Sequence, residues 1–95
     1  MFEKLKQFKD LRDKAKEIQT SLAAETVEGT GAWNKVKITM DGNQNVTAVT
    51  IADEILGDKS KIQDGVREAV NDAVKKAQRK MMEKMKDMGA LPGMG

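Results

Sequence analysis

Carboxylates are the main acid–base groups that this sequence offers for catalysis. The 95-residue chain has no Cys, no His and no Tyr, which removes thiol nucleophiles, imidazole bases and Cys/His zinc sites. Asp53 and Glu54 are adjacent and Asp41 precedes a glycine, but no glycine-rich phosphate loop of the Walker or dinucleotide type accompanies them. We therefore expect no enzyme, no catalytic or metal-binding residues, no cofactor and no small-molecule substrate.

A run of cations near the C-terminus is the stronger chemical signal. The net charge of the whole chain is only +2, yet residues 75–86 hold six basic residues against one acidic residue, Glu83. On a helix, cations spaced four residues apart share one face, and such a ribbon can lie along DNA phosphates, where each contact releases condensed counterions. The candidate DNA-binding residues are Lys75, Lys76, Arg79, Lys80, Lys84 and Lys86, with help from Lys4, Lys9 or Lys16.

The same run also fits a solvated face of a long helix, because Lys and Arg favour helix C-termini. If it binds DNA, it contains a single Arg, the usual bidentate reader of guanine, so we expect little base specificity. The three aromatic residues, Phe2, Phe8 and Trp33, are scattered, which argues against a stacking surface for single strands. The duplex backbone is therefore the expected target, and Trp33 is expected to pack over the rim of a sheet.

The first element that must support these residues is a helix over residues 2–25. Apolar residues at Phe8, Leu11, Ala15, Ile18 and Leu22 follow 3-4-3-4 spacing, which predicts one narrow apolar seam. Two heptads are too few to be stable alone. The seam must therefore lie against the rest of the chain or against a second copy of it.

Three strands are predicted next, over residues 26–31, 35–40 and 46–51. Alternating polar and apolar residues mark the second strand, and Asp41-Gly42 supplies a turn in which Gly42 tolerates positive φ. The glycines at 29 and 31 indicate a bulge or a close backbone approach. Short sequential strands with tight connections favour an antiparallel meander.

A second, longer helix is predicted over residues 60–88. Before it, a single helical turn at 52–57 places Ile55 and Leu56 against the sheet edge, and Ser60 with Gln63 resembles a capping box. A helix of this length extends about 40 Å, whereas five-residue strands span roughly 17 Å. Its far end must therefore project or pair, and residues 89–95 form a tail rich in glycine. Gly65 inside this helix could permit a close approach.

The order of these elements resembles the YbaB/EbfC family of bacterial nucleoid-associated proteins, over nearly the whole chain. Residues 36–42 (VKITMDG) and 49–51 (VTI) are similar to the central hairpin of the family, residues 70–73 (VNDA) and the cations after them to its second helix, and residues 91–93 (LPG) to its tail. Residues 32–35 (AWNK) depart from the small residues expected there, which bears on the local strand pairing.

The resemblance implies a single α+β domain over residues 1–95 that forms a tweezer-shaped homodimer. It also implies a protein of the cytoplasm and nucleoid that binds double-stranded DNA and alters its conformation, with roles in nucleoid organisation and gene regulation. No apolar run is long enough for a membrane span or a secretion signal, so we expect no membrane partner. The alternative is a dimeric, chaperone-like adaptor whose helices grip another protein and whose charges serve solubility.

Overall fold

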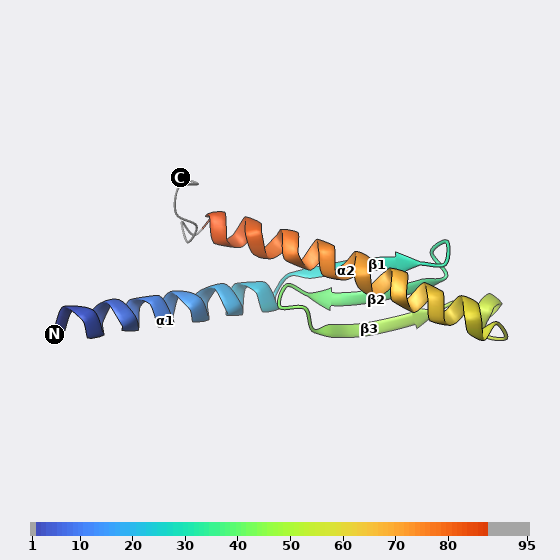
Figure 1. Ribbon diagram of the computed structural model, residues 1–95, viewed down its shortest axis with the longest axis horizontal. Coiled ribbons are helices and arrows are strands. Elements are labelled where there is room, and N and C mark those ends of the chain that lie inside the picture. Colours follow the sequence, from blue (N-terminus) through green and yellow to red (C-terminus); the bar gives the residue numbers. More distant parts are fainter. Residues whose placement is uncertain (1, 88–95) are drawn as a thin grey trace.

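The computed structural model describes residues 2–87, with side chains from Lys6 onward. Helix α1 (Phe2–Ala23) leads into strands β1 (Thr26–Gly31), β2 (Val36–Asp41) and β3 (Val46–Ile51), then a short 3₁₀ helix η1 (Asp53–Ile55) and helix α2 (Lys59–Asp87) (Figure 1). The strands form one antiparallel sheet in the order β1-β2-β3. This confirms the expected α+β architecture with an antiparallel meander between two helices.

Several predicted boundaries were wrong by one or two residues. Helix α1 ends two residues early, β2 is shifted by one residue, and α2 begins at Lys59; the predicted end at Met88 and the tail 89–95 lie outside the described residues. The capping box at Ser60 was also wrong. Asp58 caps α2 instead, its carboxylate accepting a hydrogen bond from the Lys61 amide at 3.0 Å.

The core depends on an unusually close approach of α2 to β1. Gly29 and Gly31 lie on β1, and a Cβ at either position would overlap a backbone carbonyl of α2, that of Ala69 or Gly65 respectively. A Cβ on Gly65 would in turn lie 2.6 Å from Val36. The expected close backbone approach is therefore confirmed on both sides of the contact.

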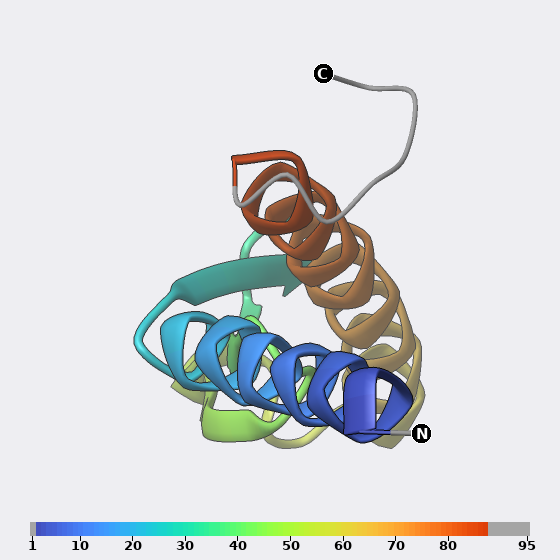
Figure 2. The ribbon, with the colours of Figure 1, turned by 90° about the vertical axis from the view of Figure 1, so that its left-hand side faces the viewer.

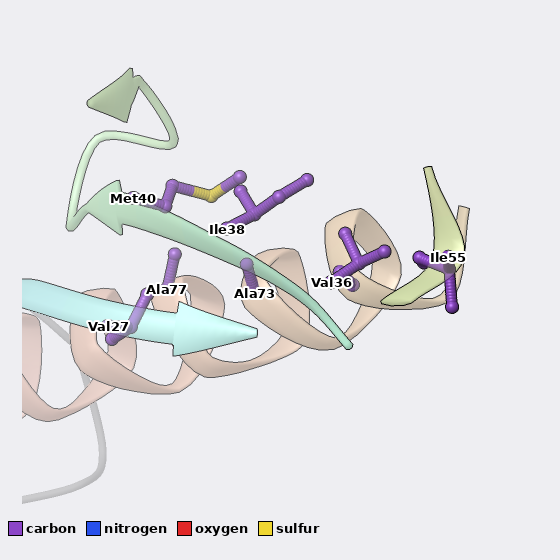
Figure 3. Packing of buried hydrophobic residues seen from close by; sticks show 8 residues of the cluster. Val27, Val36, Ile38, Met40, Ile55, Ala73 and Ala77 are labelled. Atoms are coloured by element: carbon purple, nitrogen blue, oxygen red, sulfur yellow. The ribbon is translucent and has the colours of Figure 1, made fainter. Parts of the chain in front are cut away.

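Small residues on α2 face larger ones on the sheet. Ala69, Ala73 and Ala77 are fully buried at successive turns of the helix, and they pack with Val36, Ile38 and Met40 of β2 (Figure 3). Ile55 joins this cluster, but Leu56 is exposed, so the prediction that both would cover the sheet edge was wrong for Leu56. A single 3₁₀ turn brings only one of two adjacent side chains to the core.

Strand β3 is left open by this arrangement. Its Val49 and Ile51 pair with Ile38 and Val36 of β2, so they share the face that α2 covers, because directly opposed residues point the same way. Yet Val46 and Val49 are 50% and 53% exposed. Helix α2 lies over β1 and β2, and the third strand receives no comparable cover within residues 2–87.

The direction of α1 is set by the turn between β2 and β3. The Gly42 amide donates to the Leu22 carbonyl at 2.9 Å, and the Asn43 side chain donates to the Gln19 carbonyl at 2.9 Å. A Cβ on Gly42 would lie 2.7 Å from the Leu22 oxygen. Gly42 is thus required for this close approach rather than for the predicted positive φ, which Gln44 adopts instead (φ 67°).

Helix α1 then runs away from the sheet as an arm (Figure 1). Leu22 at its base is buried, but Phe8 and Leu11 farther out are 70% and 68% exposed. Helices α1 and α2 are in contact, but seen from the end of α1 their outer ends diverge (Figure 2). The molecule measures 63 × 22 × 18 Å with a radius of gyration of 18.0 Å, against about 12 Å for a compact chain of this length.

The turn between β1 and β2 also differs from expectation. Ala32, Trp33 and Asn34 all have positive φ, between 51° and 68°, a conformation that is uncommon for residues other than glycine. Trp33 is 95% exposed, so the prediction that it packs over the sheet rim was wrong. The left-handed turn directs the indole away from the sheet.

The packing of α2 on β1 makes a direct prediction for Gly29→Ala. The added methyl group must overlap backbone atoms that cannot rotate away, so we expect destabilisation of about 1–3 kcal/mol. Thermal denaturation followed by circular dichroism measures this. Gly57→Ala is the matched control, because a Cβ at Gly57 meets no atom within 4 Å; equal melting temperatures for the two variants would contradict the packing argument.

Candidate nucleic-acid interface

The six predicted cations lie on the second half of α2 and fall into two groups. Lys76, Lys80 and Lys84 turn toward the body of the protein and are half-buried, whereas Lys75, Arg79 and Lys86 are exposed. The spacing of four residues that grouped the first three in sequence also places them on one side of the helix. Burial and partners, rather than charge, distinguish the two groups.

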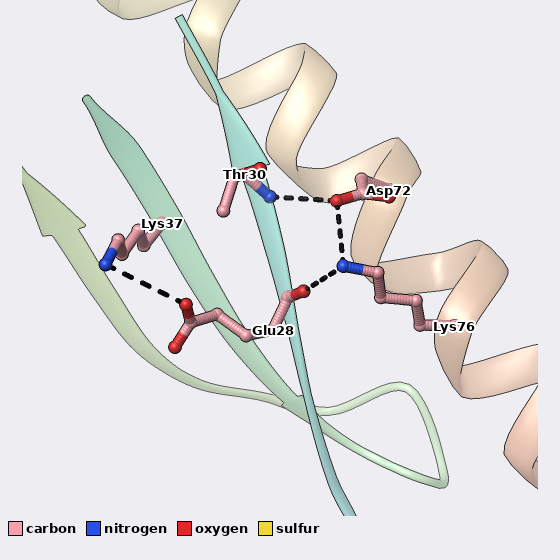
Figure 4. Close-up of polar contacts among 5 residues, drawn as sticks. All are labelled: Glu28, Thr30, Lys37, Asp72 and Lys76. Carbon is pink, nitrogen blue, oxygen red and sulfur yellow. Dashed lines mark hydrogen bonds and ion pairs between the residues drawn. The ribbon is translucent and has the colours of Figure 1, made fainter. Parts of the chain in front are cut away.

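Lys76 binds to the edge strand of the sheet, β1. Its ammonium donates to the Glu28 carbonyl at 2.8 Å and lies 3.2 Å from Asp72 Oδ2, while the same Asp72 oxygen accepts the Thr30 amide at 3.0 Å (Figure 4). Backbone groups on the outer edge of β1 thus find partners on α2. This contact closes an edge that would otherwise be free to pair with another strand.

Lys80 and Lys84 reach across to the start of β1. Lys84 Nζ lies 3.1 Å from Glu25 Oε1, and Lys80 Nζ lies 4.0 Å from Glu25 Oε2 and 3.9 Å from Glu83. Hydrogen bonding from Lys84, followed by its charge, lowers the pKa of the Glu25 carboxyl below its ordinary value of 4.5. Glu25 is therefore held ionised between two lysines.

The remaining cations form an exposed row. Lys75, Arg79 and Lys86 fall on one line along α2, with exposed Met82 completing the four- and three-residue steps. None of the three takes part in an ion pair among residues 6–87. We call Lys75, Arg79 and Lys86 the exposed row. It extends about 16 Å, close to five base-pair steps of duplex DNA at 3.4 Å each.

Beside the exposed row lies a shallow groove of about 470 Å³. Arg79 forms part of its wall together with Lys76 and Lys80, and Glu28 and Glu83 contribute the opposite charge. Three cations against two carboxylates leave a small positive excess. The groove could accept part of a phosphate backbone that follows α2.

The predicted helpers on the first helix lie on a separate arm. Lys9 and Lys16 are exposed on α1, and the Lys4 side chain lies outside those described. No contact in the described structure joins these lysines to the exposed row. They would extend the basic surface rather than complete one site.

Carboxylate partners were missed in the sequence interpretation. Asp72 precedes Lys76 by four residues, a spacing that favours a helical ion pair, so this partner was detectable. Glu25 lies 59 residues from Lys84, and no local pattern indicates that they meet.

Within residues 2–87, no group of three or more acidic side chains could hold a metal ion, and no helix is long and apolar enough to cross a membrane.

Fold and charge together describe a small α+β protein with a basic second half of α2, residues 75–86, which we call the basic arm. The YbaB/EbfC DNA-binding family model matches residues 1–91. The chain therefore belongs to the YbaB/EbfC DNA-binding family, which is named for binding rather than for a reaction.

Two individual proteins extend the comparison. The nucleoid-associated protein glr3498 of Gloeobacter violaceus is 35% identical over 60 residues, which are 63% of this chain. The matched region spans about half of that relative's length, 54%. The crystal structure of the uncharacterized protein HP0035 from Helicobacter pylori superposes with a TM-score of 0.78 at 18% identity, covering 93% of this chain and 96% of the other. That likeness establishes a shared fold.

The sealed edge of β1 predicts a pH dependence of stability. The Thr30 amide, and next Lys76, lower the pKa of Asp72, so its stabilising contribution is complete above the unfolded pKa of about 4 and is lost as pH falls through the lower folded value. The melting temperature of Asp72→Asn should lie below that of the wild type at pH 6 and should fall less between pH 6 and pH 3. Thermal melts at both pH values test this.

Glu17→Gln on exposed α1 is the control for removal of one carboxylate. The melting temperature of this variant should depend on pH as that of the wild type does. An equal fall in melting temperature for Asp72→Asn and the wild type between pH 6 and pH 3 would contradict a stabilising role of the Asp72 carboxylate.

Proposed function

We propose that this protein binds double-stranded DNA through phosphate contacts made by the basic half of α2. Membership of a DNA-binding family supports the ligand, and the observation that supports the location is the exposed row, three cations without carboxylate partners among the described residues. Lys76, Lys80 and Lys84 lie behind this row and are paired with carboxylates of the same chain. The proposed ligand and the name of the Gloeobacter violaceus relative support a nucleoid-associated role in the cytoplasm.

The chemistry of the row favours the DNA backbone over the bases. Two of its three members are lysines, which act as point charges, and Arg79 is the one side chain able to form a bidentate contact. The row is also straight and exposed, so it can approach a duplex from outside without entering a groove. Binding should therefore depend strongly on salt and weakly on sequence.

We further propose that the protein acts as a homodimer. Strand β3 has the sequence VTAVTI, without charge, proline or glycine, and natural proteins normally protect such an open edge. The outer part of the apolar seam on α1 is also uncovered, with Phe8 and Leu11 exposed. A second copy supplies the complementary apolar surface for both, and a two-fold axis lets each protomer cover the other.

A dimer also supports an effect on DNA conformation. Two copies of the exposed row would be held at a fixed separation on one elongated body. DNA that contacts both rows must follow their spacing, or two duplexes must be brought together. Two weak contacts on one body also bind more tightly than either one alone.

The proposal is tested by the triple variant Lys75→Gln/Arg79→Gln/Lys86→Gln. Loss of three phosphate contacts should weaken duplex binding at least tenfold at 100 mM salt and flatten the slope of log K against log salt by about 2–3. Gel shifts with a long duplex and nonspecific competitor, repeated over a salt series, measure both quantities. The row is exposed, so the circular dichroism spectrum should not change.

The matched control removes the same charge at the opposite end of α2, as Lys59→Gln/Lys61→Gln/Arg67→Gln. It should leave most of the affinity intact. Equal losses in both variants would reduce the effect to net charge and overturn the site. Binding of a protein partner that persists at 0.5 M salt, with no DNA affinity, would instead support the adaptor function.

The dimer is tested by Leu11→Asp and, separately, Val49→Asp. Both side chains are exposed in the single chain, so a charge there should spare the monomer fold but disrupt a covered apolar surface. Light scattering coupled to gel filtration should give twice the chain mass of 10.5 kDa for the wild type and a lower mass for the variants. A wild-type protein with the mass of one chain would refute the dimer.

A further inference from the structure

Half of the cations on the basic arm of α2 are already bound to carboxylates of the same chain. Lys76 lies against Asp72, Lys80 against Glu25 and Glu83, and Lys84 against Glu25. Asp72 and Glu83 belong to α2 itself and pair at ordinary helical spacings. Glu25 differs because it comes from the segment between α1 and β1, so only the tertiary fold brings it to the arm.

The geometry around Glu25 resembles that of a bound phosphate. Its two carboxylate oxygens face two different lysines, Oε1 toward Lys84 at 3.1 Å and Oε2 toward Lys80 at 4.0 Å. A phosphodiester likewise presents two anionic oxygens to neighbouring lysines. The Glu25 side chain is 30% exposed, so an incoming anion can reach the same ammonium groups from solvent.

We propose that Glu25 competes with DNA phosphates for Lys80 and Lys84 and so limits the DNA affinity of the basic arm. This inference rests on the proposed DNA-binding function and assigns a regulatory residue to that site. Glu25 is a positioning residue, because it acts through the two lysines rather than on the DNA. Exposed and half-exposed ion pairs are weak, so DNA can replace the carboxylate. The free energy gained from each such phosphate contact is reduced by that of the ion pair that it breaks.

Competition predicts a gain of function, which a merely structural role does not. If Glu25 only braced α1 and β1 against α2, its loss would loosen the arm and weaken binding. If it competes with phosphate, its loss releases two lysines for DNA. Each phosphate newly neutralised should steepen the slope of log K against log salt by about 0.9.

The test is Glu25→Gln, which keeps the size of the side chain and removes its charge. Fluorescence anisotropy with a labelled duplex of about 30 base pairs, from 50 to 300 mM salt, gives the affinity and the slope. We expect binding about threefold to tenfold tighter at 100 mM salt and a slope steeper by about 1–2. Unchanged or weaker binding by a folded variant would overturn the proposal.

Two controls separate competition from a general change in charge. Glu68→Gln makes the same change of one unit at an exposed position near the opposite end of the protein, and it should alter affinity less than about twofold. In a Lys80→Gln/Lys84→Gln background, Glu25→Gln should have no effect, since the competed groups are gone. A gain of equal size in either control would overturn the proposal.

Stability and basal binding are measured alongside. Should Glu25→Gln not fold, Glu25→Asp keeps the charge but withdraws the carboxylate by one methylene group, and a smaller gain in the same direction is expected; no gain would overturn the proposal. A wild-type protein without duplex affinity at 50 mM salt refutes the proposed function itself. Wild-type binding without a gain in the variant refutes only the role of Glu25.

Discussion

The close contact between α2 and β1 is the constraint on which the other features depend. Gly29 and Gly31 allow the helix backbone to lie almost directly on the strand, and the buried alanines of α2 complete the contact. At this distance Asp72 and Lys76 can bond to backbone groups of β1, and Lys80 and Lys84 can reach Glu25. Any larger side chain on the strand would move α2 outward, and all four of these contacts would lengthen together.

That same contact leaves the protein with one closed side and one open side. Helix α2 covers β1 and β2 and seals the edge of β1, while β3 leaves Val46 and Val49 exposed and the outer part of α1 leaves Phe8 and Leu11 exposed. A thin core is expected of a domain with 95 residues, which buries only about 60–65% of its unfolded surface. The uncovered surfaces lie on β3 and on the outer part of α1, which α2 covers less than it covers β1 and β2. Burial of these surfaces by a second copy would therefore add to the core without disturbing the basic arm.

Much of the fold could be predicted because its signals are local. The apolar seam from Phe8 to Leu22, the alternation in β2 and the paired glycines of β1 each follow from the period of one element. The errors arose where neighbours in space decide. Asp58 rather than Ser60 caps α2, Gly42 is needed for contact with Leu22 rather than for its φ, and Trp33 points into solvent from a left-handed turn.

The sequence by itself determined the order of elements, the concentration of positive charge on residues 75–86 and the absence of Cys and His. These are properties of composition and short-range spacing, and they already point to a binding protein. Tertiary structure alone decided which cations remain exposed. Glu25 and the edge of β1 are far from α2 in sequence but lie on one side of it, where they pair with Lys76, Lys80 and Lys84. The cations on the other side, Lys75, Arg79 and Lys86, stay exposed. Helical periodicity predicts which residues share a face of the helix, but it does not predict what that face contacts.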